Sequence, residues 1–569
     1  MQVNLREYAQ QDLEHLCKLG LHPVLARILA ARDVRHEDEL GGGLDQLIPP
    51  QQLLGIKEMA QMLADAIVAQ EKILIIGDYD CDGATATAVA VKALRRMGAQ
   101  VDFLVPNRFQ YGYGLSPEIV EFAQQFHPKW IVTVDNGIAS ISGVEKANEL
   151  GIKVLITDHH LPAQALPQAA AIVNPNQHGC TFPSKNLAGV GVIFYVMMML
   201  RGELRDRGLY QQDTQPNLSD LLDLVALGTV ADLVKLDRNN RILVEHGLAR
   251  MRSGKACAGI RALFQIAARD IRYANSQDLG FSIGPRINAA GRLEDISLGI
   301  MCLLAEHMPE ALLLAQRLND INQQRKSIEQ EIKFSAETLL QGQDIQQRSS
   351  ICLFDADWHH GVIGIVASRI KEAFHRPVIV FAPDEQDLLR GSGRSIPNLH
   401  LRDALDAVSK LDSDLMIKFG GHAMAAGLSI RPEKFERFCI LFEQVVSSLV
   451  TPSDLQKTIL VDGSLADEKL DWSLVEMLEQ QAWGQGFPAP IFCDEFAIKQ
   501  QKIVGEKHLK LSLQLQSEGQ QILDGIYFFQ QEFLPEQVKL LYQVQINRFN
   551  DRKNIQLQIL HVVGAKLSA

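Results

Sequence analysis

The segment KILIIGDYDCDGATATAVAVKALRRMG, residues 72–98, decides the fold of the first domain. It begins with KILIIG (72–77), a short β-branched apolar run that is typical of a buried parallel strand. Aspartates follow this strand at once, and the alanine-rich stretch after them predicts a helix over 84–98. A strand, a polar loop and a helix in this order predict the start of an alternating α/β domain.

Two more apolar runs, KWIVTV (129–134) and KVLIT (153–157), predict strands of the same kind. The first runs into VDNG and the second into TDHH, so each also ends in acidic or histidine side chains. Because the carboxyl ends of parallel strands share one edge of a sheet, these polar side chains should converge there. The residues expected at this edge are Asp80, Asp82, Asp135, Asp158, His159 and His160.

A fourth acidic motif is Asp232, which ends the apolar segment GTVAD. Carboxylates gathered this closely repel one another unless cations neutralise them, which predicts a pair of divalent metal ions. Carboxylate oxygens with one or two imidazoles and no thiolate suit Mn²⁺ or Mg²⁺ better than structural zinc. The alternative is that each aspartate only caps a helix or shapes a turn, but four such motifs together favour the metal site.

Composition restricts the class of protein. The eight cysteines are scattered without a CxxC pair, which argues against a disulfide framework or a zinc ribbon and predicts a reducing, cytoplasmic location. The N-terminus lacks the pattern of a signal peptide, and the apolar stretch 187–200 is too short to span a bilayer, so we expect a buried helix there and no membrane partner. The net charge of −12 opposes nucleic-acid binding through the overall field but leaves room for local basic grooves.

With 569 residues the chain should form about two to four domains. Apolar residues recur at three, four or seven positions between Leu314 and Leu339, which predicts one long amphipathic helix. The predicted divisions are an N-terminal extension packed on the first domain (1–50), a doubly wound α/β domain (51–305), the connector helix (306–345), a second α/β domain (346–452) and a C-terminal barrel (453–569).

The second α/β domain contains two glycine-rich stretches, RGSGRS (390–395) and FGGHAMAAGLSI (419–430). Glycine at this density indicates either tight turns or a backbone that approaches a ligand closely. Arg394 among small hydroxyl residues suits a phosphate, and Ser392 would add a hydrogen bond, although a plain turn has the same composition.

The C-terminal region alternates apolar and polar residues in HLKLSLQLQ (508–516) and KLLYQVQINRF (539–549), which predicts antiparallel strands and a small barrel. Basic residues occur there together with aromatic ones, a combination that suits single-stranded nucleic acid. The same aromatic side chains also suit a barrel core. They are Tyr527, Phe528, Phe529, Phe533, Tyr542 and Phe549.

The motifs DYDCDG, VDNG, DHH and GTVADLV resemble those of the DHH phosphoesterases, and FGGHAMAAGL resembles their DHHA1 domain. The resemblance covers residues from about 70 to 430. The length, the segments VPNRFQYGYG (105–114) and SIGPRINAAGRL (282–293), the connector and the barrel are similar to the branch of bacterial single-strand-specific 5′→3′ DNA exonucleases. This resemblance implies two domains facing each other across a groove, joined by the long helix and followed by an OB-fold that binds single strands.

The resemblance also implies roles for individual residues. The implied ligands of two Mn²⁺ or Mg²⁺ ions, with Asp135 as the bridge, are Asp80, Asp82, Asp135, His159 and Asp232. His160 is the implied catalytic contact to the scissile phosphate, and Asp78 and Asp158 would orient the ligands. The implied pocket for a 5′-phosphate consists of Arg108, Ser392 and Arg394, and the implied contacts to the substrate backbone are Asn288, Arg292 and His422.

The activity implied is hydrolysis of single-stranded DNA to 5′-mononucleotides in recombination and repair, with a helicase and a single-strand-binding protein as partners. Inorganic pyrophosphatases with DHH motifs carry a histidine where this chain has Ile76, and this difference favours the exonuclease branch. One alternative is an oligonucleotide or nucleotide-phosphate phosphatase of the same superfamily, which would share the metal ligands. The other is a non-catalytic single-strand-binding replication scaffold, but such scaffolds usually lose motif carboxylates that are all present here.

Overall fold

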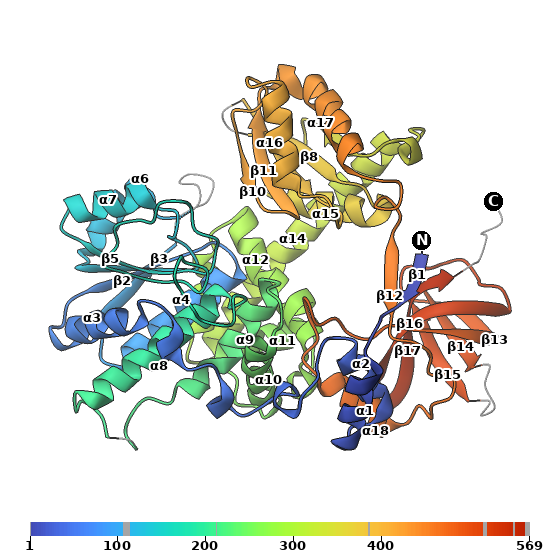
Figure 1. The fold of residues 1–569 in the computed structure, drawn as a ribbon, viewed down its shortest axis with the longest axis horizontal. Coiled ribbons are helices and arrows are strands. Elements are labelled where there is room, and N and C mark those ends of the chain that lie inside the picture. Colours follow the sequence, from blue (N-terminus) through green and yellow to red (C-terminus); the bar gives the residue numbers. More distant parts are fainter. Residues whose placement is uncertain are drawn as a thin grey trace. The chain divides into compact units, whose positions relative to one another are not determined.

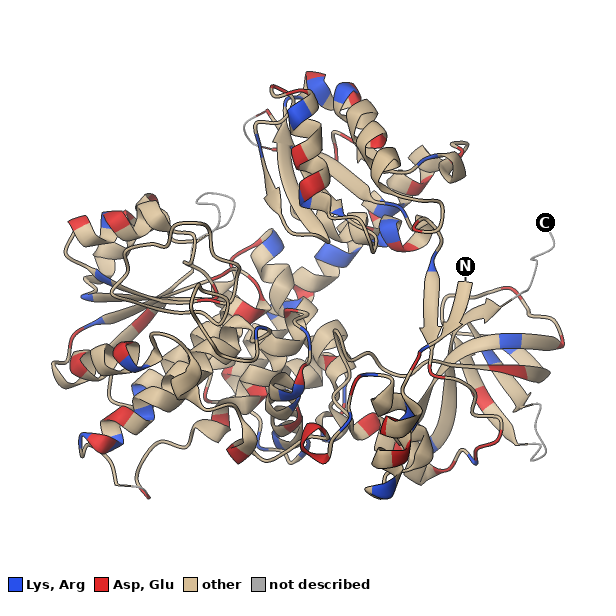
Figure 2. Ribbon diagram, in the orientation of Figure 1, with Lys and Arg blue, Asp and Glu red and all other residues tan. Residues whose placement is uncertain are grey.

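The computed structural model describes residues 2–105, 114–211, 213–384, 387–515, 521–549 and 552–563, except the side chains at 549 and 552. The chain divides into two compact units. The larger unit comprises Leu5–Gly291, Asp295–Asn319 and Leu460–Ala569, and the smaller comprises Met1–Asn4, Arg292–Glu294 and Asp320–Ile459. Acidic and basic residues are interspersed over both units (Figure 2), as expected for a chain without a strong overall basic field.

The first sheet of the larger unit is parallel and has the order β3-β2-β4-β5-β6 (Figure 1). Its strands are β2 (Ile73–Gly77), β3 (Val101–Leu104), β4 (Trp130–Val134), β5 (Lys153–Thr157) and β6 (Ala171–Val173). The three strands predicted from sequence are therefore confirmed as β2, β4 and β5. Because β3 and β4 join β2 on opposite sides, the strand order reverses between β2 and β4, where such sheets form a binding crevice.

Helices cover both faces of this sheet, which confirms the doubly wound arrangement. Helices α6 (Pro117–Ala123) and α7 (Ile141–Glu149) share a core with alternate residues of β2 and β5. The opposite face carries α3 (Ile56–Val68), α4 (Cys81–Arg96) and α8 (Gly189–Asp206) (Figure 1). Further helices of this unit are α9 (Leu222–Ala231), α10 (Arg238–Arg252), α11 (Ala258–Ile266), α12 (Gly284–Leu293) and α13 (Ser297–Leu304).

Helix α8 contains the apolar stretch that sequence analysis assigned to a buried helix, and its residues from Gly189 to Met197 are buried. Among the described residues, none of the helices combines the length and the apolar character that a membrane crossing requires.

The long helix predicted for the connector is α14, Met308–Leu340. Its apolar stripe has two parts. Ala311, Ala315 and Leu318 are buried near its start, and Ile332 and Ala336 join a core of the smaller unit near its end. The spacing of three or four residues within each part is the spacing of one helical face.

The sheet of the smaller unit has the order β10-β11-β9-β8-β7, in which only β7 and β8 are parallel. Its strands are β7 (Ile351–Phe354), β8 (Val378–Pro383), β9 (Leu389–Arg394), β10 (Lys418–Gly421) and β11 (Ala425–Ile430). The helices packed with it are α15 (Ile363–Phe374), α16 (Leu401–Leu411) and α17 (Phe435–Leu449).

The RGSGRS stretch lies in strand β9 and is not a turn. Its glycines are needed for packing: a Cβ at Gly391 would lie 2.6 Å from a ring carbon of Phe381, and one at Gly393 would lie 2.7 Å from Leu401. The side chains of Phe381 and Leu401 therefore occupy the space that a side chain at Gly391 or Gly393 would need.

The C-terminal region forms a closed barrel in the order β13-β14-β15-β17-β16. Its strands are β13 (Phe492–Val504), β14 (His508–Leu515), β15 (Ile522–Tyr527), β16 (Gln537–Phe549) and β17 (Arg552–Val563). The predicted antiparallel pairing is confirmed for β14 with β15 and for β16 with its two neighbours. Strands β15 and β17, a pair that the prediction did not include, run parallel where the five-stranded Greek-key barrel closes. Of the aromatic residues singled out, Tyr542 is buried, Phe529 is 82% exposed, and the side chain of Phe549 lies outside the described residues.

The N-terminal extension, with helices α1 (Gln10–Lys18) and α2 (Pro23–Ala30), was expected to pack on the first domain. The structure shows that it also contacts the region around Asp462. Residues 38–46 do contact α10 through Arg238 and Arg241. Arg32, however, pairs with Asp462, at Nη1–Oδ1 and Nη2–Oδ2 distances of 2.6 Å and 3.1 Å, and lies over the Trp483 ring. Strands β1 (Gln2–Leu5) and β12 (Thr458–Val461) also pair, and α18 (Trp472–Gln480) follows before the barrel.

We expect Arg32→Ala to lower the free energy of unfolding by about 3–5 kcal/mol, because it leaves the Asp462 carboxylate buried without its main partner. Both side chains of the pair are only 1% exposed. Arg35→Ala is the matched control, since that side chain is 57% exposed and its pairs should contribute less than about 1 kcal/mol. Urea unfolding measures the free energy of unfolding of both variants. Equal decreases in the two variants would contradict a stabilising role for the buried Arg32–Asp462 pair.

Candidate metal centre

Four loops of the larger unit bring the predicted residues together. Asp78, Asp80 and Asp82 follow β2, and Asp135 follows β4. Residues 158–160 follow β5, and Asp232 follows the last residue of α9. The convergence predicted from the strand ends is therefore present in the structure.

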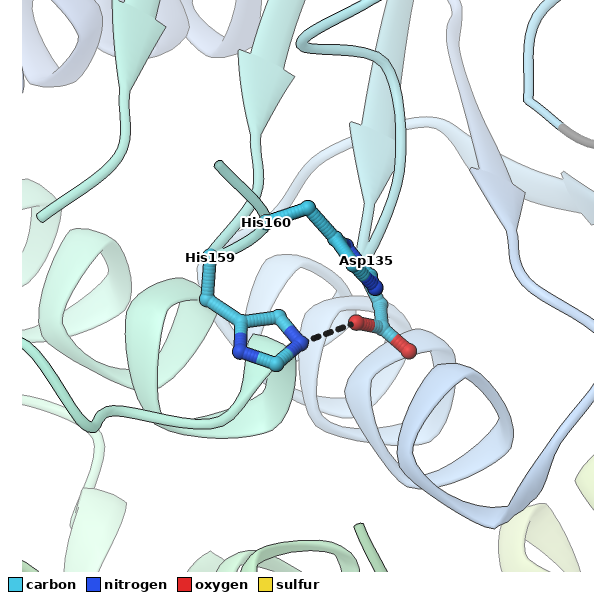
Figure 3. Close-up of side chains that lie close together, drawn as sticks. All are labelled: Asp135, His159 and His160. Atoms are coloured by element: carbon cyan, nitrogen blue, oxygen red, sulfur yellow. Dashed lines mark ion pairs between the residues drawn. The ribbon is translucent and has the colours of Figure 1, made fainter. Parts of the chain in front are cut away.

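Histidine 159 lies at the centre of this cluster. Its Nε2 atom is 3.1 Å from Oδ1 of Asp135 (Figure 3) and 3.6 Å from Oδ2 of Asp232. Possible ligand atoms lie within 4.8 Å of one another in three groups, which are Asp135 with His159 and His160, Asp82 with His159 and Asp232, and Asp78 with Asp80 and Asp135.

The carboxylates of the cluster are electrostatically costly without a cation. Burial, together with the charges of Asp82 and Asp80, raises the pKa of Asp135 well above its usual value, and the same causes act on the pKa of Asp232. Burial and the charge of Asp80 raise the pKa of Asp82 to about 7. A divalent cation would remove this repulsion, and oxygen with imidazole donors is a set that suits Mn²⁺ or Mg²⁺. The residues therefore fit the predicted pair of ions.

Asp158 organises the loop that carries both histidines. Its Oδ1 accepts hydrogen bonds from the backbone N–H groups of His159 and His160, at 2.7 Å and 3.1 Å, and Oδ2 accepts one from Ile138 at 2.9 Å. Burial alone would lower the pKa of His160, but the hydrogen bond from its Nδ1 to Asp158 and that carboxylate's charge raise it to about 9. The histidine ring is thus held at one nitrogen by Asp158.

Asp80 and Asp82 also bind the starts of two helices. Oδ1 of Asp80 accepts a hydrogen bond from Gly83 N at 3.0 Å and caps α4. The two oxygens of Asp82 accept hydrogen bonds from Gly189 N at 2.6 Å and Val190 N at 2.9 Å, in the first turn of α8. The capping interpretation is therefore correct for these residues, and it is compatible with metal binding because a carboxylate has several lone pairs.

Sequence analysis missed several residues that shape the site. Asn136 is buried, and its Nδ2 donates to the backbone oxygens of Ile76 at 3.1 Å and Val134 at 2.9 Å, which ties the ends of β2 and β4 together. Gly189 lies so close to Asp135 that a Cβ there would be 2.5 Å from the aspartate Cβ. The asparagine of VDNG was a visible signal in the sequence, whereas nothing in the apolar run indicated the role of Gly189.

Asn288 was expected to contact the substrate backbone, and the structure shows a different contact. Its Oδ1 accepts a hydrogen bond from Cys81 N at 2.7 Å, at the start of α4 and directly after the loop that follows β2. A Cβ at Gly291 would lie 1.9 Å from the backbone oxygen of Tyr79, so α12 packs tightly on this loop. A π-helical segment, Asp278–Ile283, precedes α12, and such segments are frequent at functional sites.

We therefore expect Asn288→Ala to weaken Mn²⁺ binding by about tenfold and to leave the KM for a single-stranded oligonucleotide within about twofold, because supporting contacts of this kind typically change metal affinity by that amount. Titration calorimetry with Mn²⁺ measures the first quantity. Asn288→Asp keeps the acceptor oxygen and should recover most of the affinity. A raised KM with unchanged Mn²⁺ affinity would instead favour the substrate contact.

Residues predicted to bind the substrate lie mainly in the smaller unit. Arg394 Nε donates to Ser368 Oγ at 3.2 Å, and Nη1 donates to Ser392 Oγ at 3.3 Å. Burial lowers the pKa of Arg394, and its hydrogen-bond partners among the described residues are all neutral. A Cβ at Gly364, in the first turn of α15, would lie 2.9 Å from Ser392 Oγ and 3.1 Å from Arg394 Nη2. A guanidinium, hydroxyl groups and a helix N-terminus thus meet at one place, an arrangement that suits a phosphate.

The remaining predicted contacts are placed as follows. Arg292 Nη1 donates to the backbone oxygen of Gly361 at 3.3 Å, and His422 lies in the turn between β10 and β11. Arg108 lies outside the described residues.

Comparisons with known proteins agree with this architecture. The DHH family N-terminal domain matches residues 72–229, the DHHA1 domain matches 347–448, and the RecJ OB domain matches 461–561. The first matched segment covers the parallel sheet and the cluster residues from Asp78 to His160, and Asp232 lies three residues beyond its end. The other two cover the smaller mixed sheet and the barrel.

Curated relatives are similar to the chain along nearly its whole length. A protein of Escherichia coli named single-stranded-DNA-specific exonuclease RecJ is 47% identical, and the alignment covers 98% of each chain. A RecJ exonuclease of Bacillus subtilis is 35% identical over 90% of this chain and 63% of its own length. A crystal structure of Thermus thermophilus RecJ in complex with Mn²⁺ has a TM-score of 0.81 at 28% identity, covering 100% of this chain and 80% of that one. A second structure of the T. thermophilus protein contains Mg²⁺, with a TM-score of 0.75 at 26% identity, covering 99% of this chain and 78% of that one.

Proposed function

The chain belongs to the RecJ family of single-stranded-DNA-specific exonucleases, and from this membership we propose that it removes 5′-mononucleotides from the 5′ end of single-stranded DNA. The observation that carries the proposal is the cluster of carboxylates around His159 at the carboxyl edge of the parallel sheet. The prediction of a metal-dependent single-strand exonuclease with DHH, DHHA1 and OB domains is confirmed by the family, and its polarity and product are proposed here.

The proposed holders of the two Mn²⁺ or Mg²⁺ ions are Asp80, Asp82, Asp135, His159 and Asp232. Two such ions, when bound, lower the pKa of water toward about 7 and stabilise the charge of the phosphoryl group in an in-line displacement. Asp135 and His159 each belong to two of the three ligand groups, and of the two only Asp135 offers two oxygen atoms, which supports its proposed role as the bridging residue. His160, held at Nδ1 by Asp158, would use Nε2 to contact the scissile phosphate, and either His160 or water would protonate the leaving 3′-oxygen.

The site around Arg394 supports the proposed polarity. A 5′-terminal phosphate bound by Arg394, Ser392 and the first turn of α15 would make the 5′ end the end of the strand that the enzyme holds. Arg108 would belong to the same pocket, and Arg292 and His422 would contact the backbone of the strand. Access to duplex DNA would then require a helicase or a frayed end, and a single-strand-binding protein is the second proposed partner in recombination and repair.

Product analysis on a single strand labelled at one end tests polarity and reaction class together. We expect 5′-labelled mononucleotide as the first product and a kcat/KM about ten- to one-hundredfold lower when the 5′-phosphate is absent, because the strand loses a charge-assisted contact that positions it. Arg394→Gln should remove most of this preference. Arg390→Gln is the matched control on the same strand, since Arg390 already pairs with Asp384 at 3.3 Å.

Several outcomes would contradict the proposal. Release of the 3′ label first would overturn the polarity, and release of only inorganic phosphate from short oligonucleotides would favour the phosphatase alternative. Binding of the strand without cleavage in Mn²⁺ would favour the scaffold alternative, although all the motif carboxylates are present and meet in the larger unit.

A further inference from the structure

Leu233 is an unusual residue in both backbone conformation and exposure. It follows Asp232, the C-cap residue of α9, and has a φ of 62°. This left-handed position after a helix is normally occupied by glycine, because a Cβ is strained there. Burial does not compensate for the strain, since 65% of the leucine side chain is exposed to solvent. The chain therefore keeps a large apolar side chain where glycine would be more stable.

The position of Leu233 indicates why it is kept. Oδ2 of the preceding residue, Asp232, lies 3.6 Å from Nε2 of His159. Leu233 therefore directly follows, in the chain, a residue of the candidate metal site. A second leucine, Leu161, directly follows His160 and is 66% exposed. Strain that persists beside a reactive centre is a sign of function, since stability alone would remove it.

We propose that Leu233 is a substrate-contacting residue that packs against the face of a nucleobase close to the scissile phosphate. The proposal rests on the function proposed above. An apolar side chain gains nothing from a phosphate in water, whereas the faces of the bases are the main apolar surface of single-stranded DNA. A phosphodiester held by the metal ligands would bring the adjoining nucleosides next to residue 233. In a duplex, base stacking and pairing would hide these faces, so the contact also favours single strands.

The test uses the full-length protein with Leu233→Gly and Leu233→Ala. Glycine relieves the strain and alanine keeps it, so the melting temperature of Leu233→Gly should equal or exceed that of the parent, and that of Leu233→Ala should be lower than that of Leu233→Gly. Both variants should nevertheless show kcat/KM about tenfold lower on a 5′-phosphorylated single strand, because both lose the apolar contact area. His127→Gly is the matched control, since His127 is exposed, has a φ of 50° and precedes β4 at the opposite end of the strand from Asp135. It should relieve similar strain without changing kcat/KM.

A strand with a stable abasic analogue at the first, second or third nucleotide identifies the contact. For at least one of these strands the kcat/KM values of the parent and of Leu233→Gly should differ by less than twofold, because the base that Leu233 touches is already missing. Equal activity of parent and Leu233→Gly on the intact strand, or an undiminished difference on all three abasic strands, would overturn the proposal. A loss of Mn²⁺ affinity in calorimetry would also overturn it, since Leu233 would then act through Asp232. Failure of the parent to degrade any single strand would count instead against the proposed function.

Discussion

Replacement of Asp135 by asparagine is expected to lower kcat on single-stranded DNA by at least about 10³-fold and, at the same time, to stabilise the metal-free protein. Asparagine keeps the shape of the side chain but removes the charge that would bridge two cations. The buried Asp135 carboxyl has a pKa well above its usual value, because burial and neighbouring aspartates disfavour its charged form. Without metal this carboxyl is therefore a cost to the folded state, and removing it should raise the free energy of unfolding by about 1 kcal/mol.

The two effects separate the metal interpretation from a structural one. Thermal unfolding in a chelator should show a melting temperature for Asp135→Asn at or above that of the parent. Added Mn²⁺ should stabilise the parent in proportion to the logarithm of its concentration and should stabilise the variant much less. Asp223→Asn is the control: Asp223 is buried too, but its oxygens accept hydrogen bonds from Leu224 N and Cys257 N, so this change should cost stability without changing the response to Mn²⁺. If Asp135→Asn still degrades single strands in Mn²⁺ at a rate near that of the parent, two-metal catalysis by this cluster is excluded.

Gly189→Ala is expected to reduce kcat by about one-hundredfold although residue 189 has no side-chain functional group. A Cβ there would lie 2.5 Å from Cβ and 2.6 Å from Oδ1 of Asp135, so either α8 or the aspartate must move. The backbone N–H of Gly189 also donates to Asp82 at 2.6 Å, which couples any shift of α8 to a second ligand. In an exposed helix the same substitution would stabilise by up to about 1 kcal/mol, but the steric conflict outweighs that gain here.

Gly202→Ala, in the same helix, provides the comparison. Nothing lies within 4 Å of a Cβ at residue 202, so this variant should keep full activity and melt at a slightly higher temperature than the parent. Steady-state kinetics and Mn²⁺ titration of both variants measure the effect. Activity of Gly189→Ala within tenfold of the parent would show that the site tolerates displacement of α8.

The strands and the clustering of acidic and histidine side chains at their ends were predictable because their signals are local. A β-branched run such as KILIIG identifies β2 without reference to the rest of the chain, and parallel pairing then brings its end to the edge where β4 and β5 end. The placement of Asp135 near His159 follows from that rule. Similarly, the three- and four-residue spacing of apolar side chains was sufficient to predict α14.

Other features depend on contacts between distant segments. The N-terminal helices were expected on the first domain, and no local pattern indicates that Arg32 pairs with Asp462, 430 residues later. The segment RGSGRS has the composition of a turn, yet packing of Phe381 and Leu401 against its glycines makes it strand β9. Asn288 was expected to contact the substrate, yet its side chain accepts a hydrogen bond from Cys81 N, because α12 packs on the loop that follows β2.

The sequence by itself determined the parallel sheet, the acidic motifs at its edge, the long helix and the barrel, because each depends on periodicity or on spacing within a short stretch. Only the tertiary structure decided which backbone groups hold the aspartates, which glycines leave room for them, and that Leu233 stands strained and exposed beside Asp232. The physical reason is that periodicity is a property of neighbouring residues. Steric exclusion and hydrogen bonding between distant segments exist only after the chain has folded.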